Sequence, residues 1–105
     1  MHTEDKLLAI EFKRRLEALT EVKQMIVFGS RARGNSSPGS DLDVFIEDPD
    51  LSNKLREKIF EITWEVSFEN EIVISTLLAT SKMLVNSPLA ANPILHTIQA
   101  EGIAV

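Results

Sequence analysis

The stretch that decides the fold is FGSRARGNSSPGSDLDVFI, which spans residues 28–46. A short apolar run at residues 25–28 leads into it and predicts a buried strand. Glycine, serine, asparagine and proline dominate residues 29–40, so a loop is expected there. Residues 41–47 then alternate between two kinds of side chain, which predicts a second strand. One face of that strand carries Asp41, Asp43, Phe45 and Glu47.

Amphipathic helices are predicted on both sides of this stretch. Residues 6–19 and residues 51–66 each repeat apolar side chains at intervals of three or four, the spacing of one helix face. Asp50 is the expected N-cap of the second helix, because its carboxylate can accept a hydrogen bond from a free backbone amide. Asn70 is expected to end that helix in the left-handed conformation.

The C-terminal part predicts one more strand and one more helix. Residues 72–78 are apolar enough for a mostly buried strand. Asn92 and Pro93 resemble an N-cap and a first helical residue, and Gly102 resembles a helix stop. The order helix, strand, strand, helix, strand, helix predicts an α/β (α+β) fold with helices packed on a small mixed sheet. Since no linker or repeat divides the chain, we expect residues 1–105 to form a single domain.

Composition narrows the class of protein. Of the 105 residues, 44% are hydrophobic and 26% are charged, which is typical of a globular domain. The sequence contains no cysteine, which excludes disulfides, thiolate metal sites and cysteine nucleophiles. A net charge of −5 argues against a general nucleic-acid surface. There is no secretory signal and no apolar run long enough for a bilayer, so we expect no membrane association and a cytoplasmic location.

Asp41 and Asp43 form the first half of a candidate site. Two residues apart on a strand, they project from the same face, about 7 Å apart at the backbone. Carboxylates at this spacing can share hard cations such as Mg²⁺ or Mn²⁺, which prefer oxygen ligands. Two such ions can hold the attacking and leaving oxygens of a phosphoryl transfer. The spacing therefore indicates a metal site for phosphate chemistry.

The loop before these acids forms the second half. Gly29 has no Cβ, so the backbone can approach a ligand closely there. If Ser30 begins a short helical turn, its hydroxyl and the free amides nearby would meet a phosphate. Two interpretations of Arg31 and Arg33 are open: either they neutralise a polyphosphate, or they face solvent or a partner chain. Together the two halves describe a metal–nucleotide site.

In this order the motifs resemble the minimal nucleotidyltransferases of the DNA polymerase beta superfamily. Members carry Gly-Ser, a spacer of about ten residues and then Asp-hydrophobic-Asp. Here the spacer between Gly29-Ser30 and Asp41 is residues 31–40. The resemblance implies that Asp41 and Asp43 are catalytic metal ligands. The nucleotide-binding residues that it implies are Gly29, Ser30, Arg31, Arg33 and Ser40.

One position departs from the family pattern. Active members carry a third carboxylate on the strand that follows the long helix, whereas residues 72–77 contain no acid. Glu71 is the nearest acid, so it is a candidate third metal ligand; the alternative is an exposed acid at the start of the strand. Trp64 and Phe68, four residues apart on the preceding helix, are expected in the core or in an interface rather than as a base-stacking shelf.

The resemblance implies transfer of NMP, from ATP or another NTP, to an acceptor hydroxyl. Minimal members of this superfamily are often paired with a small helical HEPN-type protein in toxin–antitoxin modules, so a HEPN-type partner is expected, and a homodimer is possible. The alternative is a binding module with the same fold and incomplete metal ligands, which acts by occluding its partner or sensing a nucleotide.

Overall fold

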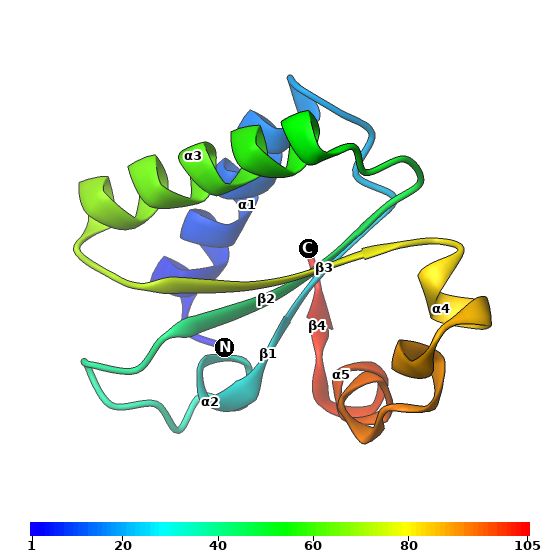
Figure 1. The fold of residues 1–105 in the computed structure, drawn as a ribbon. Helices are drawn as coiled ribbons and strands as arrows, with labels where there is room; N and C mark the ends of the chain where they lie inside the picture. Colours follow the sequence, from blue (N-terminus) through cyan, green and yellow to red (C-terminus); the bar gives the residue numbers. More distant parts are fainter.

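A four-stranded sheet forms the centre of the computed structural model, which describes residues 1–105 (Figure 1). The strands are β1 (Gln24–Phe28), β2 (Leu42–Asp48), β3 (Ile74–Thr80) and β4 (Ile103–Ala104). Their spatial order is β3-β2-β1-β4. β1 is antiparallel to β2 and β4, whereas β2 and β3 run parallel. The mixed sheet with packed helices confirms the predicted fold class.

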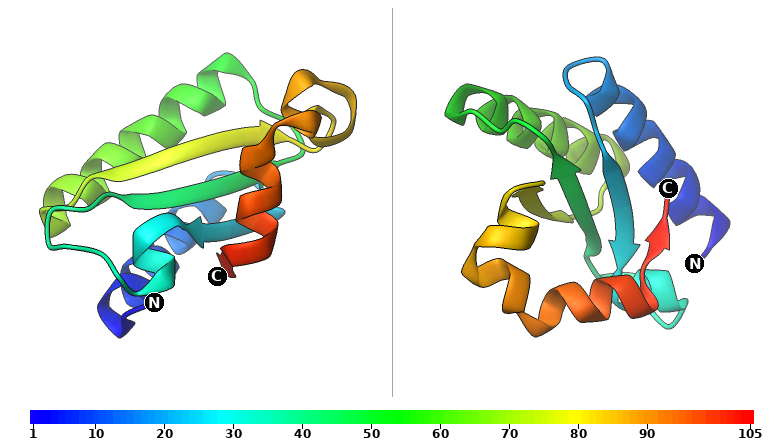
Figure 2. Two further views of the ribbon diagram at one scale, coloured as in Figure 1. Left: turned by 90° about the horizontal axis from the view of Figure 1, so that it is seen from below. Right: turned by 90° about the vertical axis from the view of Figure 1, so that its right-hand side faces the viewer.

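Two helices cover one face of the sheet, α1 (Thr3–Glu17) and α3 (Asn53–Asn70) (Figure 2). Burial of their apolar sides against alternate residues of β2 removes a large apolar area from water, which drives the packing. The main core is built from Ala9, Phe12 and Leu16 of α1, Ile59 and Val66 of α3, and Leu42, Val44 and Ile46 of β2, among others. Because side chains alternate along a strand, the remaining side chains of β2 face the side of the sheet away from α1 and α3.

The opposite face is covered only in part. After β3 the chain forms α4 (Met83–Asn86), a 3-10 helix η1 (Pro88–Ala91) and α5 (Pro93–Glu101), as Figure 1 shows. A small cluster joins this region to the sheet through Phe45, Ala79 and Ile98. No helix in the chain combines the length and apolarity needed to cross a membrane.

Two predicted helix boundaries were wrong. The N-cap of α3 is Ser52, whose hydroxyl accepts a hydrogen bond from the amide of Leu55 at 3.0 Å. Asp50 lies earlier, where its own amide donates to the buried carboxylate of Asp48. The left-handed residue that ends α3 is Glu71, with φ of 52°, and not Asn70.

Other expectations fared differently. Asn92 caps α5, with Pro93 as the first helical residue and Gly102 as the C-cap, as predicted. The expected loop at residues 29–40 begins instead with a short helix, α2 (Gly29–Arg33). The third strand starts two residues later than predicted, because Glu71 first turns the chain. The segments α4, η1 and β4 were not predicted.

Candidate nucleotide and metal site

Asp43 and Gly29 lie next to each other, at the end of β1 and the start of β2. Phe28, the last residue of β1, pairs with Asp43, so Gly29 follows directly beside this carboxylate. A Cβ added at Gly29 would clash with Oδ2 of Asp43. Gly29 also has φ of +75°, a conformation that favours glycine. The glycine thus lets the backbone turn into α2 against the aspartate.

The two aspartates interact electrostatically. Partial burial of Asp43, followed by repulsion from Asp41, raises the pKa of the Asp43 carboxyl above its ordinary value. Arg33 acts in the opposite direction and lowers this pKa. No hydrogen bond within the chain contributes to the shift. Two carboxylates therefore share one region without a protein group that compensates both.

Ser30 lies in the first turn of α2, as the motif requires for contact with a phosphate. It is half-buried, and α2 is closed by its C-cap, Gly34, in the left-handed conformation. Ser40 lies at the other end of the loop, where its hydroxyl interacts with Ser37 at 3.1 Å. In this structure Ser40 therefore stabilises the loop before Asp41.

Arg31 is bound within the chain and holds the loop before Asp41 in place. Its guanidinium donates to the carbonyl of Ser40 at 2.9 Å and to that of Pro38 at 3.2 Å. It also donates to Oδ1 of Asp5 at 2.9 Å, in an ion pair of which both side chains are largely buried. Oδ2 of Asp5 is buried with no hydrogen-bond partner. Asp5 was missed from the sequence, because its partner lies 26 residues further on.

Arg33 is the arginine that faces the acids. It is about half exposed, lies close enough to affect the pKa of Asp43, and forms a 3.4 Å ion pair with Glu101 at the end of α5. An exposed pair at this distance contributes little stability, so the guanidinium can be diverted to an anionic ligand. Of the two arginines, Arg33 is thus the one whose charge acts on Asp43.

The structure does not bring Glu71 together with Asp41 and Asp43. No group of three His, Cys, Asp or Glu side chains is close enough to hold a metal ion. Glu71 instead ends α3 and lines a hollow with Asp5 and Arg31, on the side of the Arg31 ion pair. The β3 residue directly beside Asp43 is Ser75, which carries no charge. The candidate metal site therefore consists of two carboxylates.

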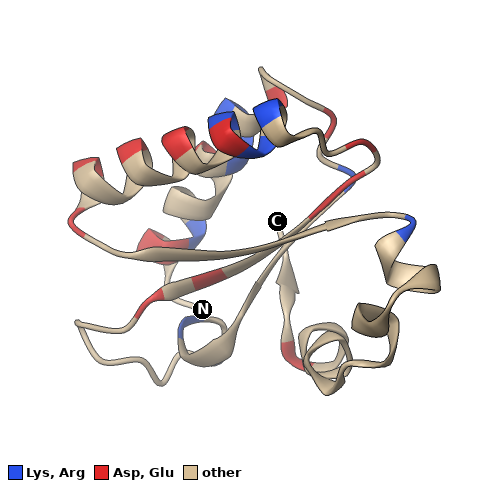
Figure 3. Ribbon diagram, in the orientation of Figure 1, with Lys and Arg blue, Asp and Glu red and all other residues tan.

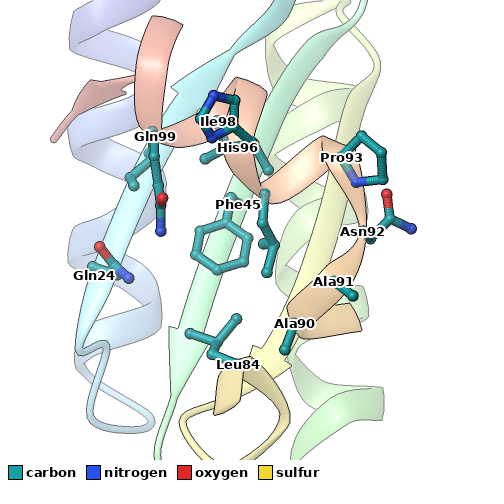
Figure 4. A pocket seen from close by; sticks show the side chains of 12 residues that line it. Gln24, Phe45, Leu84, Ala90, Ala91, Asn92, Pro93, His96, Ile98 and Gln99 are labelled. Atoms are coloured by element: carbon teal, nitrogen blue, oxygen red, sulfur yellow. The ribbon is translucent and has the colours of Figure 1, made fainter. Parts of the chain in front are cut away.

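A second cavity lies further along the same face of the sheet (Figure 4). Its volume is about 310 Å³, and Phe45 of β2 separates it along the strand from Asp43. Polar side chains, among them Gln24, His96 and Gln99, share the lining with apolar ones. The cavity contains no acid and is distinct from the aspartate pair.

The family follows from comparison with known proteins. The profile of the nucleotidyltransferase domain matches residues 9–87, which include the Gly-Ser turn and both aspartates. The chain belongs to the nucleotidyltransferase domain family. No curated protein sequence gives a significant match.

Solved structures of toxin–antitoxin complexes share the fold. A mutant of the MntA–HpeT complex gives a TM-score of 0.63 at 17% identity, over 100% of this chain and 72% of the other. A toxin–antitoxin structure with AMP-PNP gives 0.61 at 18%, over 98% and 72%. A third, a tri-AMPylated HEPN toxin with its MNT antitoxin from Shewanella oneidensis, gives 0.54 at 15%, over 95% and 70%. At these identities the likeness concerns the fold.

Proposed function

We propose that this nucleotidyltransferase-family chain is a metal-dependent enzyme that transfers AMP from ATP to a hydroxyl group on a partner protein. The observation that carries the proposal is the placement of Asp41 and Asp43 beside the Gly29-Ser30 turn. Burial and, after it, repulsion from Asp41 raise the pKa of Asp43, so the pair is suited to a bound cation. Such a combination of acids and a glycine turn fits a metal-chelated nucleotide.

The donor set fits Mg²⁺ or Mn²⁺. Both aspartates offer hard oxygen atoms, and neither is neutralised by a hydrogen-bonded cation within the chain. Asp41 and Asp43 would hold the metal, which supplies charge stabilisation for the phosphates and the leaving pyrophosphate. Mg²⁺ commonly retains waters and uses one or two carboxylates together with substrate phosphates, so two protein ligands are compatible with it.

The remaining roles fall to residues of the turn. Ser30 and the backbone after Gly29 bind the terminal phosphates, and Arg33 neutralises part of their charge. The acceptor hydroxyl attacks the α-phosphorus, and the bond from that phosphorus to the pyrophosphate oxygen breaks. A carboxylate of the aspartate pair takes the hydroxyl proton. Arg31 acts indirectly, since it fixes the loop that leads to Asp41.

The acceptor is proposed to be a helical HEPN-type protein, with which the chain would form a cytoplasmic toxin–antitoxin module. One observation supports this partner. Chains of the same fold occur in toxin–antitoxin complexes, one of which is a complex of an AMPylated HEPN toxin with its MNT antitoxin.

A second candidate function is a binding module that neutralises its partner without catalysis. The observation in its favour is Ser75, which stands beside Asp43 where a third carboxylate would complete the metal cage. The variant Ser75→Asp separates the two candidates. In an enzyme limited by its metal ligands, it should raise Mn²⁺ affinity and transfer; in a binding module, transfer should stay absent in both forms.

The decisive experiment measures label transfer. The chain is co-expressed with the product of the neighbouring reading frame, and the purified mixture is incubated with α-labelled ATP and Mg²⁺. We expect label and one added AMP, detected by mass spectrometry, on the partner only when metal is present. Asp43→Asn is the negative control. Nucleotide binding without transfer to any co-expressed protein would refute the enzyme and favour the binding module.

A further inference from the structure

An aromatic ridge runs along the outer side of α3. Phe60, Trp64 and Phe68 recur every four residues and therefore share one side of the helix. Their exposed fractions are 47%, 71% and 77%. The core is reached by other residues of α3, namely Ile59, Thr63 and Val66. The ridge therefore lies outside the core of the single chain, and such exposed apolar patches mark interaction sites.

A shallow apolar hollow adjoins the C-terminal part of this ridge. It has a volume of about 390 Å³ and lies between the end of α3 and the segment that leads into β3. Its lining consists of Trp64, Ser67, Phe68, Glu71, Ile72 and Val73. β3 is an edge strand, and none of its residues is charged or proline. Charged residues or prolines usually protect the edge strands of monomeric proteins from pairing with other chains. Because β3 has neither, this side of the molecule is suited to contact with another chain.

The charges of α3 are segregated along its length. Residues 53–60 contain three cations, Lys54, Arg56 and Lys58, and one acid. Residues 61–71 contain four acids and no cation. Figure 3 shows the blue bands gathered at the N-terminal end of α3 and the red bands along the rest. The helix thus has a positive half, residues 53–60, and a negative half, residues 61–71, and the sign changes within the ridge, directly after Phe60.

We propose that this surface binds a second copy of the chain, with the two α3 helices antiparallel across a twofold axis. This orientation places the basic half of each helix against the acidic half of its partner, whereas a parallel arrangement would oppose like charges. It also brings Phe60 of one copy opposite the region of Phe68 and the adjoining hollow in the other. Phe60 and the hollow that would receive it lie on the same surface of each copy, as a twofold-symmetric (isologous) contact requires.

The proposed contact is compatible with both size and function. A standard interface buries about 800 Å² per partner, and buried aromatic side chains remove roughly 150–250 Å² each, so three of them supply much of the area. The core side chains of β2 face α1 and α3, while Asp43 belongs to the opposite set. A dimer through α3 therefore leaves the aspartate pair accessible.

The first test measures the mass of the isolated chain in solution by sedimentation or light scattering. We expect a dimer for the wild type and a monomer for Trp64→Ser/Phe68→Ser, because removal of central aromatics weakens dimerisation by at least about 30-fold. The matched control is Val85→Ser on α4, which removes an equally exposed apolar side chain (72%) and should remain dimeric. A monomeric wild type at high micromolar concentration, or a dimeric Trp64→Ser/Phe68→Ser variant, would overturn the proposal.

The second test uses charge reversal and identifies the occupant. Lys54→Glu/Lys58→Glu makes both halves acidic, and Glu61→Lys/Glu65→Lys/Glu71→Lys makes both halves basic; each should weaken the dimer. All five side chains are exposed, so folding should be retained. The variant with all five substitutions exchanges the signs of the two halves and should restore the dimer, since both copies change together. If the surface instead binds a different protein, this variant will not recover association, and the proposal fails.

Discussion

Asp43 and Glu47 lie four residues apart on β2 and belong to the same alternating set, yet their surroundings are opposite. Glu47 is buried, and its carboxylate accepts hydrogen bonds from Gln24 at 2.7 Å and Ser81 at 2.6 Å. Lys23 lies 3.6 Å away as a third partner. Although burial alone would raise the pKa of Glu47, these partners lower it. Asp43 has no such partners, and its pKa is raised.

The difference separates a structural acid from a candidate ligand-binding acid. A carboxylate with all its partners in the same chain stabilises the fold and has little left to offer a ligand. A carboxylate that is desolvated and repelled by Asp41 gains most when an external cation arrives. Two acids that look alike in the sequence therefore have different expected roles, and the following predictions test that division.

The largest effect is expected on catalysis. Asp43→Asn or Asp41→Asn should lower AMP transfer by more than about 100-fold, since loss of even an indirect partner of a metal ligand lowers activity roughly 10–100-fold. Circular dichroism should show an unchanged fold. Label transfer from ATP in the presence of Mg²⁺ measures the loss. A variant with full activity would break the comparison, because Asp43 would then be no more functional than Glu47.

The next effect concerns stabilisation by ligands. Mg²⁺ and ATP together should stabilise the wild type more than either alone, and by about 2.7 kcal/mol when the complex is present at 100 times its Kd. The gain should persist in Glu47→Gln and disappear in Asp43→Asn. Thermal melts with each ligand alone and with both provide the measurement. Equal melting temperatures in all conditions would contradict the proposed site.

Substitution of Glu47 should lower the stability of the fold, whereas substitution of Asp43 should lower activity. Glu47→Ala leaves the Gln24 amide and the Ser81 hydroxyl without their acceptor, so the free energy of unfolding should fall by about 1–3 kcal/mol. Urea denaturation measures this change. The matched control is Ser75→Ala, an exposed position on β3 that should change stability little. An unaffected Glu47→Ala variant would show that these bonds contribute no net stability.

The smallest effect is a pH-dependent gain from Asp43→Asn. A carboxyl whose pKa is raised on folding binds its proton more tightly in the native state, so it lowers stability as the pH rises through its titration range. Removal of the charge should therefore stabilise the metal-free protein at neutral pH, by less than about 1 kcal/mol because solvent screens a half-exposed group. At acid pH the gain should vanish. Paired melts at neutral and acid pH give the measurement, and a gain of the same size at both would point to another cause.

Much of the fold was predictable because its signals are local. The helical repeats of α1 and α3, the apolar run of β1 and the alternation of β2 all lie within single segments. Cap positions were harder, since Asp50 and Ser52 are both competent caps and the choice depends on Asp48. β4 contains two residues and exists only through pairing with β1, so no local pattern could indicate it.

In the candidate site, the order of the motif located the aspartates and the glycine turn, which the register of β1 and β2 then placed together. The direction of Arg31 could not be predicted, because it depends on Asp5, an acid on a different helix. The same holds for Glu71, whose left-handed conformation turns the chain before β3 begins. Ser75, the real neighbour of Asp43, was identified only by the parallel register.

Because Gly29 and Asp43 are in contact, a mutation at either position should have the same consequence. Any side chain at position 29 would displace the Asp43 carboxylate and would also strain a backbone with positive φ. A substitution of Gly29 therefore carries the phenotype of a substitution at Asp43, although the aspartate codon is unchanged. In genetic terms the two residues form one mutational target, and a screen for inactive variants should recover both positions with the same defect.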